Sequence, residues 1–322
     1  MDSQHAAPAA AGVTLRAGTV LDVTTDGVVG RREAIRLAVM GLGLGAVAAG
    51  CRGQGSPTVE AGPDATIPYR LVASYPTGVP YVAAGAPSRL PFQIARPDGT
   101  LLDDLPAVLP ATIWRDGRQV GDRIELTGRS DGADAGYVAL ETTFEEPVVH
   151  EVRITLDNEE LTARVAVYDA ATVVTPQVGV RMPSAATPTM DQRLAVDPIC
   201  TLSPQCPLHD TSLDAALGSG GPVALVVGSA EFCLDLRCGP TLSNFVEVAA
   251  GFPTVTSIHA EPYRNPKAVP ELLEADPTEL VELLAINWEP AIFLIGRDGT
   301  IRARADAVAG TAELRTLFET IA

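Results

Sequence analysis

Short apolar segments alternate with turn-forming residues between positions 67 and 170. In residues 153–156 and 163–167, apolar and polar side chains alternate one by one, which is typical of a strand with one buried face. Asp116-Gly117 is one of the turn signals that separate the segments. We therefore predict strands at residues 69–74, 90–95, 111–114, 123–127, 137–143, 148–156 and 161–168. Strands of this length and spacing indicate an immunoglobulin-like β-sandwich over residues 67–170.

The pattern changes near residue 174 to alternating strands and helices. Residues 223–227 form an unbroken apolar run, which is typical of a strand buried on both faces. Asp276-Pro277-Thr278-Glu279 is a helix-start signal, because Asp can cap a helix and Pro suits its first turn. We predict strands at 223–227, 255–260, 291–295 and 301–305, and helices at 242–250, after 276 and at 311–321. This order predicts an α/β domain over residues 174–322.

The first 50 residues have the organisation of an export signal. Residues 1–29 lack periodicity and predict a disordered extension. Arg31 and Arg32 then precede a short apolar run that ends Ala-Ala-Gly before Cys51. A basic region, a short apolar region and a small-residue junction define a secretory signal, and the run is too short to span a bilayer.

Two details of this segment resemble known bacterial signals. The paired arginines resemble a twin-arginine signal, although Gly30 stands where Ser or Thr is usual, so the general export route is an alternative. The junction before Cys51 resembles a lipobox, where bacterial lipoproteins are cleaved and acylated. We predict an exported lipoprotein anchored through Cys51 to the outer face of the cytoplasmic membrane. Residues 52–66, rich in Gly, Pro and Ser, would be a flexible tether.

The charge of the chain narrows the partners that it can have. It carries 40 acidic and 23 basic residues, a net charge of −17. A nucleic-acid-binding protein needs a basic footprint, so we predict no nucleic-acid partner, and membrane contact through the lipid anchor only. The sequence lacks a Walker loop, a dinucleotide fingerprint and a His-Glu-x-x-His motif, and we predict no cofactor.

Four of the five cysteines lie close together in the α/β region, and the β-sandwich region has none. Pro204 favours a turn between Cys200 and Cys206, so we predict a structural disulfide between these two. A zinc site that includes His209 is the alternative, but it lacks an evident fourth ligand. Without cysteines, the sandwich would serve as a spacer or scaffold, or would bind a partner.

Two local motifs carry a resemblance to the thioredoxin family. Residues 227–233, Val-Gly-Ser-Ala-Glu-Phe-Cys, resemble the strand and turn that lead to the thioredoxin nucleophile. Residues 288–293, Trp-Glu-Pro-Ala-Ile-Phe, resemble the loop whose proline is cis in that family. Residues 178–189 resemble the entry to extracytoplasmic thioredoxin-like lipoproteins, and the predicted order of elements is also that of the thioredoxin fold. The resemblance implies that Cys233 attacks, Cys238 resolves, and Pro290 presents backbone to an extended substrate.

The spacing of these two cysteines departs from the family. Four residues separate Cys233 from Cys238, where thioredoxins have two, and Cys238-Gly239-Pro240-Thr241 imitates the start of Cys-Gly-Pro-Cys. Either cysteine can therefore be the attacking thiol. Arg237 favours a thiolate beside it, and Asp235 opposes one.

The leading functional hypothesis is a membrane-anchored thiol–disulfide oxidoreductase, whose partners are the thiols or disulfides of exported proteins or a redox partner. One alternative is a non-catalytic binding protein with structural disulfides. Another is a copper-delivery protein that uses cysteines and a distant histidine. His259 is the candidate for that ligand, although its place in an apolar strand is more typical of a core histidine.

Overall fold

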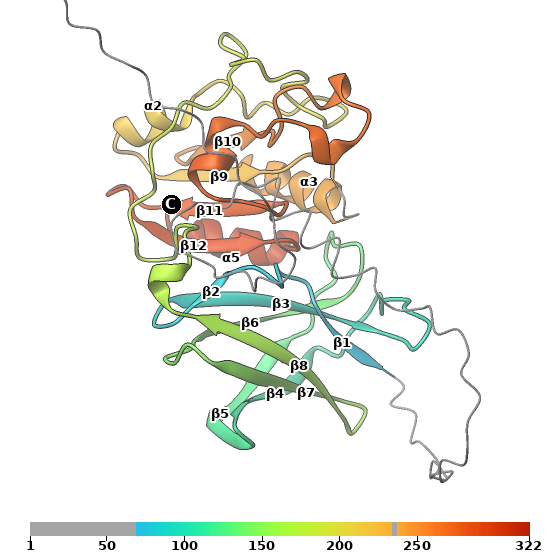
Figure 1. The fold of residues 1–322 in the computed structure, drawn as a ribbon. Helices are drawn as coiled ribbons and strands as arrows, with labels where there is room; N and C mark the ends of the chain where they lie inside the picture. The colour runs from blue at the N-terminus through green and yellow to red at the C-terminus, as the bar shows by residue number, and fades with distance from the viewer. Residues whose placement is uncertain (1–68, 234–236) are drawn as a thin grey trace, which may run out of the picture.

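The computed structural model describes residues 69–233 and 237–322 (Figure 1). The predicted signal, the tether, Arg31, Arg32 and Cys51 lie outside the described residues, as does Asp235. Within the described ranges, no helix has the length and apolar character that crossing a membrane requires.

Residues 69–168, called here the β half, fold into two β-sheets. The strands are β1 (Arg70–Ala73), β2 (Val82–Ala83), β3 (Pro87–Ala95), β4 (Val108–Arg115), β5 (Arg118–Thr127), β6 (Tyr137–Thr143), β7 (Val149–Leu156) and β8 (Glu159–Tyr168). One sheet has the order β1-β3-β6 and the other β2-β8-β7-β4-β5. The seven predicted strands are confirmed, β6 with the predicted ends and the other six with shifted ends, whereas the two-residue β2 is too short to leave a pattern in the sequence.

The core of the β half lies between the two sheets. In β7, alternate residues are buried, as expected from the alternation of apolar and polar side chains. Val152 and Ile154 of β7 pack in one cluster with Phe92 and Leu140 of the other sheet. β3 is different, because every residue from Leu90 to Ala95 is buried. Its second face is therefore covered by another part of the protein.

Residues 174–322, called here the α/β half, contain one mixed sheet. Its strands are β9 (Val223–Val227), β10 (Thr256–Ala260), β11 (Ala291–Ile295) and β12 (Ile301–Asp306), in the order β10-β9-β11-β12. β10 runs parallel to β9, whereas β11 is antiparallel to both β9 and β12. The α-helices are α2 (Leu213–Gly218), α3 (Cys238–Ala249), α4 (Glu279–Leu283) and α5 (Thr311–Glu319).

Helices cover both faces of this sheet. Phe245 of α3 and Phe318 of α5 pack with Val226 of β9 on one face. Leu213 of α2 and Leu280 of α4 pack on the other face, with strand residues that point the opposite way. β9 is buried along its whole length for this reason, as its apolar run predicts.

The start of α4 differs from the prediction. The helix begins at Glu279 after Thr278, and Asp276 does not cap it. Asp276 instead lies in an extended segment, where its carbonyl accepts from the backbone N–H of Arg264 at 2.9 Å. Pro277 forms a bridge with Tyr263 in the same segment. Asp276 and Pro277 therefore pair through their backbone with residues 263 and 264, and the helix starts after them.

The two halves are joined by a buried polar interface. The β1-β3-β6 sheet lies between the five-stranded sheet and the α/β half (Figure 1). Arg89 of β3 forms an ion pair with Glu313 of α5, with Nε and Oε1 2.7 Å apart. Asp131 of the β half caps α5, because its Oδ2 accepts from the backbone N–H of Ala312 at 2.6 Å and from the Thr311 hydroxyl at 3.0 Å. The sandwich is thus more than a spacer, since it completes a helix of the other half.

Candidate functional site

Cys233 and Cys238 form a disulfide at the point where the chain passes from β9 to α3. Cys233 lies in the loop after β9, Cys238 is the first residue of α3, and their Cα atoms are 6.4 Å apart. Cys233 is partly exposed, whereas Cys238 is only 1% exposed. An attacking group from outside therefore meets Cys233 first.

Pro290 and Glu289 lie beside this disulfide. The Glu289–Pro290 peptide bond is cis, and it directly precedes β11. The carboxylate of Glu289 and the two sulfurs lie within 4.8 Å of one another. Glu289 also accepts a hydrogen bond from the backbone N–H of Ser229 at 3.1 Å. The structure thus brings Cys233 and Cys238 together beside the segment that carries Pro290, and adds Glu289, whose only signal in the sequence is its place next to Pro290.

Cys200 and Cys206 do not form the predicted disulfide. Both are free thiols, and their sulfurs are 3.7 Å apart, well beyond the ~2.05 Å of a disulfide bond. The turn at Pro204 does bring them close, but histidine nitrogens surround them. Cys206 Sγ lies 3.2 Å from His209 Nε2 and 3.4 Å from His259 Nδ1. Cys200 Sγ lies 3.8 Å from the same His259 nitrogen.

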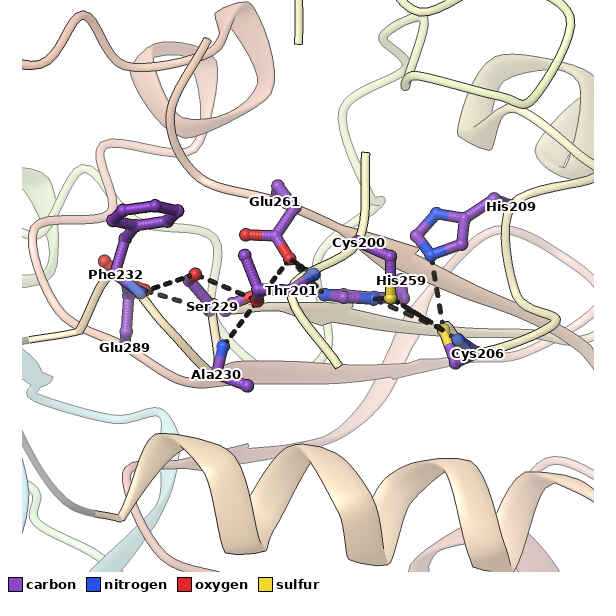
Figure 2. A network of polar contacts seen from close by, with 11 residues as sticks. Cys200, Thr201, Cys206, His209, Ser229, Ala230, Phe232, His259, Glu261 and Glu289 are labelled. Atoms are coloured by element: carbon purple, nitrogen blue, oxygen red, sulfur yellow. Dashed lines mark hydrogen bonds and ion pairs between the residues drawn. The ribbon is translucent and has the colours of Figure 1, made fainter. Parts of the chain in front are cut away.

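His259 is a core histidine, as expected, but it is also part of this cluster. It is fully buried in β10, and its Nε2 is 2.9 Å from the carbonyl oxygen of Gly228. Its Nδ1 points at the two sulfurs (Figure 2). More than fifty positions separate it from the cysteines, so only the folded sheet reveals the contact. The short spacing of Cys200, Cys206 and His209 in the sequence indicates that these three lie together. His259 is the fourth member of the cluster, which spacing along the chain does not reveal.

A chain of hydrogen bonds links the cluster to the loop that carries Cys233 (Figure 2). Glu261 accepts from the backbone N–H and from the hydroxyl of Thr201, both at 2.7 Å. The Thr201 hydroxyl accepts from the backbone N–H of Ala230 at 2.7 Å and lies 3.1 Å from the Ser229 hydroxyl. Ser229 in turn accepts from the backbone N–H of Phe232 at 3.0 Å. Thr201 and Glu261 carry no motif, and sequence reasoning missed both.

The electrostatics of the cluster favour one thiolate beside one thiol. Contact with Cys206 lowers the pKa of the Cys200 thiol, and the same contact raises the pKa of Cys206. Burial acts to lower the pKa of His259, but its contact with Cys200 and the charge of Glu261 outweigh burial and raise it. Burial raises the pKa of the Glu261 carboxyl, against the opposing effect of His259.

Comparisons with known proteins give only weak similarities. No family model and no curated protein matches the chain. A thiol:disulfide interchange protein of the thioredoxin family from Chlorobium tepidum TLS is 15% identical, with 44% of this chain and 95% of that chain covered and a TM-score of 0.28. The Lin-41 filamin domain is 14% identical, with 31% of this chain and 90% of that chain covered and a TM-score of 0.22. At these TM-scores the similarities carry no argument about fold or function.

Proposed function

We propose that the protein is a thiol–disulfide oxidoreductase whose redox pair is Cys233 and Cys238. The observation that carries the proposal is the disulfide at the start of α3, with Glu289 and Pro290 beside it. The order β9-α3-β10-α4-β11-β12-α5 supports a thioredoxin-like domain over residues 174–322. The two packed sheets of the β half support an immunoglobulin-like sandwich over residues 67–170.

The exchange proceeds in two steps, and each step forms one sulfur–sulfur bond and breaks another. In the reduced protein, the Cys233 thiolate attacks a substrate disulfide, so that a mixed disulfide forms and one substrate thiolate leaves and takes up a proton. Cys238 then attacks Cys233 Sγ, the protein disulfide closes, and the second substrate thiol is released. The same steps run in the opposite direction when the substrate is a dithiol.

The surroundings support the reactivity of this pair. Cys238 opens a helix of 12 residues, whose first N–H groups and dipole favour a thiolate over a thiol. Arg237 adds a positive charge beside it and donates to Gln93 Oε1 of β3 at 3.3 Å. The β half thus contacts the residue next to the redox pair, which favours a role for the sandwich in holding this loop.

The runner-up is a binding protein in which the same disulfide only stabilises the fold. The burial of Cys238 favours this alternative.

Substitution of the buried thiol separates the two functions. Cys238→Ser is expected to trap mixed disulfides between Cys233 and exported proteins, because the resolving thiol is absent. Cys233→Ser and the double variant are expected to trap none. The measurement is non-reducing electrophoresis followed by mass mapping of the linked peptides.

Other outcomes of this experiment have defined meanings. Trapping by Cys233→Ser alone would make Cys238 the attacking thiol. If neither variant traps a partner and the reduction potential lies below about −300 mV, the pair is structural and the exchange function is wrong.

We also propose that the chain is exported and held at the membrane through Cys51. The basis is the sequence alone, in which Arg31 and Arg32 precede the apolar run and a lipobox-like junction ends at Cys51. Cys51→Ser is expected to move the protein from the membrane fraction to the soluble exported fraction, or to leave its signal uncleaved. Immunoblotting of the membrane and soluble fractions measures the change. If processing and membrane retention are unchanged in the variant, Cys51 is not the anchor.

A further inference from the structure

We propose that Cys200, Cys206, His209 and His259 bind one Zn²⁺ ion in a closed, tetrahedral, structural site. The four ligand atoms, two sulfurs and two ring nitrogens, all lie within 4.8 Å of one another. The site is separate from the Cys233–Cys238 pair, and the inference does not depend on the proposed redox function.

Four distances within the cluster are close to those of a tetrahedron around a metal. Zinc binds sulfur at ~2.3 Å and imidazole nitrogen at ~2.0–2.1 Å, so the edges of a Cys₂His₂ tetrahedron measure ~3.3–3.8 Å. The sulfurs of Cys200 and Cys206 are 3.7 Å apart. Three of the four sulfur–nitrogen separations are 3.2, 3.4 and 3.8 Å. A disulfide requires a much shorter separation between the sulfurs. Side chains that only fill a core have no reason to point their sulfur and nitrogen atoms at one common point.

The fold holds two of these ligands in position. His259 presents Nδ1 to the sulfurs because its Nε2 lies at hydrogen-bond distance, 2.9 Å, from the Gly228 carbonyl. A hydrogen bond from the outer ring nitrogen to a backbone carbonyl is the usual way in which a metal-binding histidine is oriented. The backbone N–H of His259 also donates to the Leu208 carbonyl at 3.0 Å, which ties the segment next to His209 to β10.

The chemistry of the donor set favours zinc over other metals. Two thiolates balance the charge of Zn²⁺, two neutral imidazoles complete the ligand set, and binding releases any proton that the ligands still carry. A tetrahedral set of two sulfurs and two nitrogens is typical of zinc, whereas calcium and magnesium prefer oxygen ligands. Cys206, His209 and His259 are buried, and all four positions come from the protein. A closed site of this kind is structural rather than catalytic.

The metal would fix the loop that leads to Cys200 and Cys206 onto the sheet. Thr201 follows Cys200, and its hydroxyl accepts a 2.7 Å hydrogen bond from the backbone N–H of Ala230. Ala230 lies three positions before Cys233 in the sequence. Zinc binding is therefore expected to stabilise the segment that presents Cys233, without taking part in its chemistry.

Metal analysis of the full-length protein tests the site. The reduced protein, stripped with a chelator, is expected to bind one Zn²⁺ per chain and to unfold at a higher temperature with zinc than without it. Cobalt in place of zinc is expected to give the ligand-field spectrum of a tetrahedral site and a thiolate-to-cobalt charge-transfer band. This spectrum reports sulfur ligation without any substitution, and so does not depend on whether a variant folds.

Matched variants identify the ligands. Cys206→Ser and His209→Gln are expected to lower zinc affinity by more than the ~100-fold that loss of an outer contact can cost. Two controls are expected to leave zinc binding unchanged. His150→Gln alters another buried histidine, in β7, and Cys238→Ser alters a buried cysteine of the other pair. The proposal is wrong if the reduced wild-type protein binds no zinc, if the cobalt spectrum lacks the charge-transfer band, or if Cys206→Ser binds zinc as tightly as wild type.

Discussion

Glu313→Gln is expected to lower the free energy of unfolding by about 3–5 kcal/mol, the usual effect of breaking a buried ion pair from one side. Arg89 donates to both carboxylate oxygens of Glu313, each at 2.7 Å, and the two side chains are 5% and 3% exposed. Tyr137 donates a third hydrogen bond to the same carboxylate at 2.6 Å. The substitution leaves the Arg89 guanidinium buried without an opposing charge. Denaturant unfolding at neutral pH measures the loss.

The same carboxylate makes stability depend on acid. Burial acts to raise the pKa of Glu313, but the charge and hydrogen bonds of Arg89 outweigh burial and lower it. A lowered pKa in the folded state means that the stabilisation is complete above the unfolded value of ~4.3 and is lost as the pH falls through the folded pKa. Glu313→Gln is therefore expected to flatten the decline in stability below that pH.

A control on the same helix distinguishes the ion pair from a general effect on α5. Glu319 lies at the end of α5 and is exposed, so Glu319→Gln is expected to change stability by no more than ~0.5 kcal/mol. Equal effects of the two substitutions, or no change in the acid dependence with Glu313→Gln, would show that Arg89 is not compensated by Glu313.

Asp306→Ala is expected to lower the free energy of unfolding by about 3–5 kcal/mol, whereas Asp298→Ala is expected to have a much smaller effect. Each aspartate accepts from an arginine of β12 at the same distance, 2.7 Å. The Arg304–Asp306 side chains are 7% and 0% exposed, and those of Arg302–Asp298 are 47% and 55% exposed. Burial distinguishes the two pairs, because water screens the exposed one, and Asp306 also accepts a hydrogen bond from the Tyr81 hydroxyl at 2.6 Å. Parallel denaturant titrations of the two variants compare them directly.

A double substitution tests the origin of the larger effect. Asp306→Ala leaves Arg304 buried without its opposing charge, against the rings of Tyr81 and Trp288. Arg304→Met together with Asp306→Ala removes that charge and is expected to recover part of the lost stability. If the double variant is less stable than Asp306→Ala alone, the contact of Arg304 with the rings, rather than its charge, dominates.

The local features of the fold could be predicted from the sequence. The apolar run at residues 223–227 reflects burial of β9 on both faces, and the alternation in β7 reflects burial on one face. Both patterns can be seen in consecutive residues of the sequence. The sequence also indicates the loop of Cys233 and the place of Pro290, because each lies in a short contiguous motif. Asp116 and Gly117 both adopt positive φ, as the turn signal predicts.

Features that depend on the tertiary arrangement could not be predicted. Arg89 and Glu313 are separated by 224 positions, and each looks like an ordinary surface charge in a sequence with many of them. His259 was assigned to an apolar strand, but the direction in which its ring points follows from the loop packed against β10. The sequence predicts that Cys200 and Cys206 lie together, but it predicts a disulfide, whereas both are free thiols that face a histidine of β10.

The interface between the halves has a consequence for how the chain is made. A ribosome releases β3, with Arg89, long before it adds Asp306 and Glu313, and domains generally fold in that order. Until then Arg89 lacks the buried carboxylate of Glu313 that it pairs with in the complete fold. We expect a chain interrupted before residue 313 to stay open to proteases at this face. Folding of the α/β half, and of α5 in particular, is therefore what closes this face of the β half.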